Sequence, residues 1–150
     1  MKFHTALLAF ALLLPIGAHA ESNPAVLDAL DDYMMFADYG GSLILPEQIP
    51  AEEWKNAVVI DTRDAGQFEK DHIPGAINIE WRQSVARRNE VPKDKLVVVY
   101  CNTGTLSAQA GLALRLLGWN NVRILQGGFE GWKTKGGFDA SKRAGRVVPE

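Results

Sequence analysis

The stretch LVVVYCNTGTLSAQAGLALRLLG, residues 96–118, decides the fold. Its first five residues are apolar or aromatic and largely β-branched, which is typical of a strand that is covered on both faces. Beyond Cys101 the apolar residues recur at helical spacing until Gly118 ends the pattern. The stretch therefore predicts a buried strand that passes through Cys101 directly into a helix.

Shorter segments on either side repeat this alternation of strand and helix. Strands are expected at 57–60, at the end of 73–79 and at 122–125, and helices at 64–69, 81–88 and 129–135, with a helical turn at 46–49. Such alternation predicts an α/β fold, a small parallel sheet of about five strands with helices on both faces. Ligands bind such sheets at the carboxyl ends of the strands, and Cys101 follows the strongest one.

The first twenty residues have the organisation of a secretory signal peptide. Lys2 precedes an apolar run from Ala6 to about Gly17, and Ala18-His19-Ala20 has the small-x-small spacing of a cleavage site. The run is roughly a dozen residues, whereas a membrane-spanning helix needs ~20, so we expect no stable membrane anchor. We expect the mature protein to begin near Glu21 and to be exported to a bacterial periplasm.

The composition indicates one domain without affinity for polyanions. Removal of Lys2 with the signal peptide leaves 15 basic and 18 acidic residues, a net charge of −3, so no nucleic-acid partner is expected. The remaining ~130 residues suit a single core. We expect residues 1–20 to be the signal peptide, 21–43 a helical extension that ends at Gly40-Gly41, 44–136 the α/β domain and 137–150 a polar, basic tail.

Cysteine and histidine are scarce in the mature chain. Cleavage removes His4 and His19 and leaves one cysteine, Cys101, and one histidine, His72. An exported protein with a single cysteine forms no internal disulfide, and a Cys/His zinc site would lack ligands. We therefore expect no metal and no cofactor. A lone cysteine is more often buried and structural, but the residues around Cys101 favour a reactive thiol.

The residues after Cys101 suit the stabilisation of an anion. A loop that leaves a strand and opens a helix turns backbone N–H groups and the positive end of the helix toward its first residue. Gly104 supplies backbone freedom, and Thr103, Thr105 and Ser107 add hydroxyl donors. Such a loop lowers the pKa of a thiol from its usual ~8.5, so we expect a thiolate at Cys101 near neutral pH.

Three separated segments resemble the signatures of the single-domain rhodaneses, a family of thiosulfate sulfurtransferase-like proteins. They are the paired stretches 58–63 and 72–78, the loop that begins at Cys101, and Gly127-Gly128-Phe129-Glu130-Gly131-Trp132. The resemblance spans about residues 44–135, so the α/β domain is identified as rhodanese-like. Each segment alone is weak, but three in order at suitable spacing are specific.

The resemblance implies a sulfurtransferase with a Cys101 persulfide as its intermediate. The sulfur would come from a small donor of the thiosulfate or mercaptopyruvate type and pass to a thiol or cyanide acceptor, with a protein acceptor also open. By similarity, the backbone amides of the loop would hold the sulfur. The loop residues are Asn102, Thr103, Gly104, Thr105, Leu106 and Ser107.

The loop departs from the family in its charge. Many members that use thiosulfate carry an arginine or lysine inside the loop, whereas this loop is uncharged. A dianionic donor would lose a charge-assisted contact, typically worth ~1.5–3 kcal/mol. Members that prefer mercaptopyruvate also have neutral loops, which keeps that donor open. The candidates for a cation from outside the loop are Arg63, Arg82, Arg87 and Arg88.

Three residues have both a structural and a substrate-binding interpretation. Asp61 and Arg63 follow a strand and could contact substrate, but base rates for paired charges favour a buried ion pair or hydrogen-bonded clip under the loop. His72 stands in a His-Ile-Pro-Gly turn, which favours a structural hydrogen bond over a dyad with Cys101.

Two other functions are left open by the sequence. A noncatalytic persulfide carrier or binding module is consistent with the neutral loop and the helical extension. A cysteine phosphatase or arsenate reductase would use a Cys-x5-Arg loop, and the position of that arginine holds Ser107, so the clamp for phosphoryl charge is missing.

Overall fold

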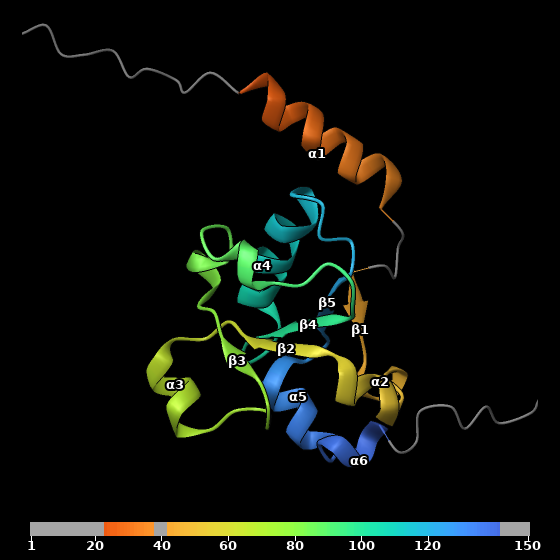
Figure 1. The fold of residues 1–150 in the computed structure, drawn as a ribbon, viewed down its shortest axis with the longest axis vertical. Coiled ribbons are helices and arrows are strands. Elements are labelled where there is room, and N and C mark those ends of the chain that lie inside the picture. The colour runs from red at the N-terminus through yellow and green to blue at the C-terminus, as the bar shows by residue number, and fades with distance from the viewer. Residues whose placement is uncertain (1–22, 38–41, 142–150) are drawn as a thin grey trace, which may run out of the picture.

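The computed structural model describes residues 23–37 and 42–141 (Figure 1). The expected signal peptide and the tail beyond Ser141 lie outside the described residues. The elements are, in chain order, α1 (Pro24–Phe36), β1 (Leu43–Ile44), η1 (Pro46–Gln48), α2 (Ala51–Asn56), β2 (Val58–Asp61), α3 (Ala65–Lys70), β3 (Ile77–Asn78), η2 (Trp81–Gln83), η3 (Arg88–Glu90), β4 (Val97–Tyr100), α4 (Thr105–Leu116), β5 (Val122–Leu125), α5 (Gly128–Thr134) and α6 (Phe138–Ser141).

The five strands form one parallel sheet in the order β1-β5-β4-β2-β3. The central strand β4 pairs with β2, where Asp61 lies opposite Tyr100, and with β5 on its other side. Because parallel strands run the same way, the carboxyl ends of β2 and β4 meet at one edge of the sheet. The sheet, with helices on both faces, confirms the predicted α/β fold class (Figure 1).

Alternate residues of β4 face two separate cores. Val98 and Tyr100 belong to the core that includes α5, while Val97 and Val99 belong to the core that includes α4. All four side chains are at most 1% exposed. Successive strand residues point to opposite faces of a sheet, so a continuous apolar run is what a strand covered on both faces requires. Burial of each such side chain stabilises the fold by about 1.5–3 kcal/mol.

Most predicted elements are present, with three differences. The sequence did not predict β1 or α2, because two and six residues are too few for a periodic apolar pattern. The predicted helix at 81–88 is wrong: the segment and its continuation form the 3₁₀ turns η2 and η3 with hydrogen-bonded turns between them. It lacks an apolar stripe to bury, since Val85 is exposed and the buried residue is Ser84.

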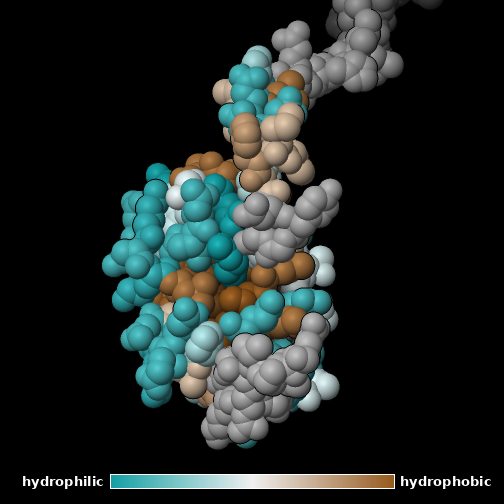
Figure 2. Space-filling model, turned by 90° about the vertical axis from the view of Figure 1, so that its right-hand side faces the viewer, coloured by the Kyte–Doolittle hydropathy of each residue, from teal (hydrophilic) through white to brown (hydrophobic). Residues whose placement is uncertain are grey.

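The helix α1 begins with the predicted cap but ends early. The Asn23 side chain accepts a hydrogen bond from the Ala25 N–H, and Pro24 opens the helix. The helix ends at Phe36, and the expected stop at Gly40-Gly41 lies outside the described residues. None of its residues is buried, and apolar side chains lie on its surface (Figure 2). No helix among the described residues is both long enough and apolar enough to span a bilayer.

The first residues of the expected tail pack on the domain. The Phe138 ring of α6 makes edge-to-face contacts with Trp54 of α2, at 5.8 Å between ring centroids, and with Trp132 of α5, at 5.3 Å. Such aromatic pairs stabilise a fold beyond the area that they bury. The packed part of the chain therefore extends past residue 136 to α6.

Candidate active site

Cys101 is the first residue after β4 and is 3% exposed. Asn102, Thr103 and Gly104 form a tight curl, and α4 begins immediately after it. Gly104 has a φ of 112°, a backbone conformation that side chains disfavour, so the curl requires glycine there. The remaining predicted loop residues belong to the first turn of α4 and are Thr105, Leu106 and Ser107.

The sulfur of Cys101 lies among hydrogen-bond donors of this curl. The Gly104 N–H donates to Sγ over 3.2 Å, and the Ser107 hydroxyl lies 3.7 Å from Sγ. That hydroxyl has one proton and is also 3.0 Å from the Gly104 carbonyl, so the backbone N–H is the firmer donor. Burial alone would raise the pKa of the thiol, but the N–H and hydroxyl of Ser107 and the N–H groups of Gly104 and Thr103 outweigh it and lower the pKa.

The amino end of α5 holds the opposite side of the curl. The N–H groups of Phe129 and Glu130 donate to the carbonyl oxygens of Cys101, at 2.8 Å, and of Asn102, at 3.0 Å. Because the C=O and the N–H of one peptide point in opposite directions, this anchoring turns the following N–H groups away from α5. A Cβ on Gly128 would lie 2.4 Å from the Cys101 carbonyl oxygen, so the close approach requires glycine.

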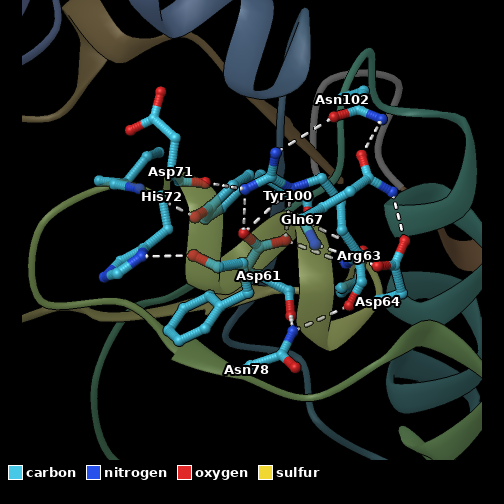
Figure 3. Close-up of polar contacts among 12 residues, drawn as sticks. Asp61, Arg63, Asp64, Gln67, Asp71, His72, Asn78, Tyr100 and Asn102 are labelled. Carbon is cyan, nitrogen blue, oxygen red and sulfur yellow. Dashed lines mark hydrogen bonds and ion pairs between the residues drawn. The ribbon is translucent and has the colours of Figure 1, made fainter.

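Asp61 and Arg63 form a buried ion pair next to the loop (Figure 3). Arg63 donates through Nε and Nη2 to the carboxylate, with a shortest distance of 2.5 Å. The guanidinium also donates to the carbonyl of Asp71, at 2.6 Å, and to Oδ1 of Asn102, at 3.3 Å. Burial alone would lower the pKa of Arg63, but Asp61 outweighs it and raises that pKa. The pair ties β2 to the loop, as the structural interpretation predicted.

His72 makes the structural contact that its turn sequence favoured. Its Nδ1 lies 2.8 Å from the carbonyl oxygen of Phe68, and its ring stacks on that of Phe68 at 4.0 Å between centroids. The Ile73 N–H next to it donates to the Tyr100 hydroxyl over 3.0 Å. These contacts fix the turn before β3 against β4 and do not orient a base toward Cys101.

The sequence of residues 46–135 matches the family described as Rhodanese-like domain. The chain belongs to that family. It is 36% identical over 91 residues to the thiosulfate sulfurtransferase GlpE of Pseudomonas syringae pv. syringae (strain B728a), which covers 61% of this chain and 86% of the relative. It is 39% identical over 82 residues to the uncharacterized protein YqhL of Bacillus subtilis (strain 168), covering 55% of this chain and 65% of the relative.

A solved structure shows the same likeness in three dimensions. The crystal structure of a rhodanese-related protein from Thermoplasma volcanium matches this chain with a TM-score of 0.58 and 27% identity. The match covers 64% of this chain and 94% of the other. Within the rhodanese-like domain, the three segments that carried the resemblance meet at one place: the end of β2, the loop after β4 and the start of α5.

Three of the four arginines considered as sources of charge for the rhodanese-like loop have partners elsewhere. Those contacts are Arg82 to Glu80 at 3.0 Å, Arg87 to Glu90 at 2.7 Å and Arg88 to the Val85 carbonyl at 2.9 Å. Arg63 contacts a loop residue, but its charge is paired with Asp61. The exposed loop residues Thr103 and Thr105, called the rim below, carry no charge themselves.

Two residues of the site were missed by the sequence analysis. Gln67 of α3 accepts a hydrogen bond from Nδ2 of Asn102 at 2.8 Å, although the two residues are 35 positions apart. An exposed glutamine on a short helix gives no sequence signal for such a contact. Gly128 was named only as part of the third segment that resembles the rhodaneses, and its close approach to the Cys101 carbonyl required the structure.

The donors around Sγ suit a thiolate, and the loop lacks the cation that a phosphoryl group requires. Among residues 23–37 and 42–141, no three His, Cys, Asp or Glu side chains gather where they could hold a metal ion. Position 107, where a Cys-x5-Arg loop has its arginine, holds a buried serine. The loop therefore supplies N–H and hydroxyl donors without the positive clamp that phosphoryl transfer uses.

Proposed function

We propose that this rhodanese-like domain is a sulfurtransferase that carries a sulfane sulfur on Cys101. The observation that carries the proposal is the cradle around Sγ, with the Gly104 N–H at 3.2 Å and a lowered thiol pKa. The thiolate is the nucleophilic form of cysteine, so these donors favour attack on a sulfur donor. Membership of the family and the name of the GlpE relative, a thiosulfate sulfurtransferase, support the same reaction class.

The reaction proceeds in two displacements on sulfur. The Cys101 thiolate attacks the outer sulfur of the donor, a new S–S bond forms, and the old bond breaks with its electron pair on the leaving fragment. That fragment is sulfite from thiosulfate, or the enolate of pyruvate from mercaptopyruvate. The acceptor then attacks the outer sulfur, cyanide becoming thiocyanate, and the Cys101 thiolate is restored. There is no net redox change, and a preformed thiolate needs no general base.

We infer that donors of low negative charge are preferred. The rim residues Thr103 and Thr105 are uncharged and exposed, and the charge of Arg63 is paired with Asp61. Loss of one charge-assisted contact of ~1.5–3 kcal/mol corresponds to roughly 10- to 150-fold in rate. Mercaptopyruvate has a single negative charge, on a carboxylate remote from its sulfur, so the neutral rim penalises it less than thiosulfate.

The proposal is tested by the mass of the purified protein. Incubation with thiosulfate or mercaptopyruvate should add one sulfur, ~32 Da, to the natural sequence and nothing to Cys101→Ser. Addition of cyanide should remove the extra mass and produce thiocyanate. Equal thiocyanate production by both proteins would rule out Cys101 as the carrier.

A noncatalytic persulfide carrier is the second candidate. The residues at the end of α1 are strongly exposed, with Met34 at 69%, Met35 at 77% and Phe36 at 80%, and exposed apolar patches of this kind contact other proteins. A carrier would deliver the sulfur to a protein acceptor. A protein isolated with an extra sulfur on Cys101, yet inert toward cyanide and small thiols, would favour the carrier over the transferase.

We also propose that the protein works after export and removal of residues 1–20. The support is the charged start, the short apolar run and the Ala18-His19-Ala20 cleavage pattern. Expression in a bacterium should yield a periplasmic protein whose amino-terminal residue is Glu21. A cytoplasmic product that retains residues 1–20 would contradict the proposal.

A further inference from the structure

The side chain of Asn102 is held by a chain of hydrogen bonds that starts on α3 (Figure 3). The Asp64 carboxylate accepts a hydrogen bond from Nε2 of Gln67. Oε1 of Gln67 accepts from Nδ2 of Asn102 at 2.8 Å, and Oδ1 of Asn102 accepts from Nη1 of Arg63 at 3.3 Å. The chain thus joins α3, the cysteine loop and the end of β2.

This chain has a single polarity. A carboxylate only accepts and a guanidinium only donates, so Gln67 must turn its NH₂ group to Asp64 and Asn102 must turn its oxygen to Arg63. The remaining oxygen of Gln67 and the remaining NH₂ group of Asn102 are then a matched acceptor and donor. A flip of either amide would bring two donors or two acceptors together, so the charged ends fix both amides.

In the chain, Asn102 lies between Cys101 and the residues whose N–H groups stabilise the sulfur. Its carbonyl is anchored by the Glu130 N–H at 3.0 Å, and its side chain by Gln67 and Arg63. Two residues further on, the N–H of Gly104 donates to Sγ. Glycine has more backbone freedom than any other residue, so Gly104 does not fix the direction of its own N–H. That direction depends on how firmly Asn102 is held.

We propose that Gln67 is a positioning residue of the cysteine loop, which acts through the side chain of Asn102 to keep the loop N–H groups on Sγ. The contact with Gln67 is the shorter of the two that the Asn102 side chain makes, 2.8 Å against 3.3 Å. The inference deepens the proposed function, since it concerns the thiol that carries the sulfur. It is tested without sulfur transfer.

The first variant, Gln67→Leu, removes the acceptor without a change of charge near the thiol. The pH dependence of Cys101 alkylation by iodoacetamide reports the pKa of the thiol directly. We expect this pKa to rise by about 0.5 unit, which leaves roughly threefold less thiolate below it. The melting temperature should hardly change, because Gln67 is exposed. The matched control is Gln83→Leu at an exposed glutamine of η2, which should leave the pH profile unchanged.

The second variant, Asn102→Ala, tests whether Gln67 acts through Asn102. In the Asn102→Ala background, Gln67→Leu should cause no further shift of the thiol pKa, because both changes break the same link. A second shift of equal size, or no shift in the natural background, would overturn the proposal. If Asn102→Ala does not fold, Asn102→Ser, which is too short to reach Gln67, takes its place. Since alkylation needs no sulfur donor, a failed sulfurtransferase assay would leave this result intact.

Discussion

The sulfur of Cys101 is stabilised by backbone N–H groups and a hydroxyl rather than by a histidine or a cation. Its firmest donor is the Gly104 N–H, while His72 faces the carbonyl of Phe68. Backbone donors do not titrate, so the reactivity of the thiol depends on its own pKa and on the geometry of the curl. At the scale of single residues, the chemistry is therefore most sensitive to groups that hold the loop in place.

The lowered thiol pKa determines the pH dependence of the first step. We expect the rate of Cys101 alkylation to rise with pH and then level off, with a midpoint at a lower pH than that of free cysteine. The same lowering stabilises the folded protein above the pKa of the unfolded-state thiol, and this contribution is lost as the pH falls through the lowered pKa of the folded state. His72→Gln should leave the alkylation profile unchanged. A midpoint at or above that of free cysteine would contradict the stabilisation of the thiolate by the loop N–H groups.

The neutral rim should limit the use of thiosulfate. We expect Thr103→Arg to raise kcat/KM for thiosulfate by about tenfold or more, as one charge-assisted contact of ~1.5 kcal/mol would. The control Thr103→Met adds length without charge and should not raise it. Thiocyanate formation with cyanide measures both. An equal response of the two variants would show that the charge of the rim does not select the donor.

The buried ion pair should be essential for stability. Asp61→Asn leaves the guanidinium of Arg63 buried and incompletely paired, so we expect the free energy of unfolding in urea to fall by about 3–5 kcal/mol. The matched control is Glu90→Gln, which breaks the exposed ion pair with Arg87. It should lower the free energy of unfolding by less than about 1 kcal/mol. Equal losses would mean that burial of the first pair has no energetic consequence.

At the scale of the elements, α4 and α5 supply different halves of the loop's hydrogen bonding. The first N–H groups of α5 bind the carbonyls of Cys101 and Asn102, while the curl and the first turn of α4 direct N–H groups to Sγ. The N–H groups of a first helical turn have no partner within the helix, so both elements have donors to offer. The loop thus depends on α5 as much as on the helix that it opens.

The contact of α5 with the loop should be sensitive to a single methyl group. Gly128→Ala would place a Cβ 2.4 Å from the Cys101 carbonyl oxygen, so we expect lower stability together with slower alkylation of Cys101. Gly75→Ala is the matched control, because Gly75 also has a positive φ but no atom within 4 Å of the added Cβ. Gly75→Ala should lower the free energy of unfolding only by the backbone strain, about 1–3 kcal/mol, and should leave the rate of Cys101 alkylation unchanged. The same alkylation rate in both variants would contradict this role of α5.

At the scale of the whole molecule, the two ends of the described chain differ in how they attach. α1 lies apart from the sheet (Figure 1), belongs to neither core and has no buried residue. In α6, by contrast, the partly exposed ring of Phe138 packs edge-to-face against Trp54 and Trp132. A short helix in water is stable mainly through tertiary packing, so the attachment of each end determines its share of the stability.

This difference predicts the outcome of two truncating changes. We expect Phe138→Ala to lower the free energy of unfolding by about 1–3 kcal/mol, because it removes two aromatic contacts. Deletion of Pro24–Phe36 should lower it less, and thermal unfolding of both variants measures the difference. A larger loss from the deletion would show that α1 is part of the domain's stable structure.

The sequence by itself determined the class of fold and the position of Cys101 between a buried strand and a helix. One continuous stretch contains the buried strand, Cys101, Gly104 and the helix, so local hydrophobic periodicity was enough to predict them. The strand at 122–125 was likewise confirmed at its predicted bounds. β1 was missed because its pairing with β5, not local periodicity, decides so short a strand. The helix at 81–88 was predicted wrongly because the segment has no apolar stripe to bury.

Only the tertiary structure decided which groups hold the loop. The contact of Gln67 with Asn102 and the anchoring of the loop carbonyls by Phe129 and Glu130 join residues that are far apart in the chain. Hydrogen bonds of this kind depend on distance and direction in space, and no local pattern of residue types records either. The candidate sulfur can therefore be named from the sequence, but the hydrogen bonds that hold its loop follow from how α3, α4 and α5 converge on it.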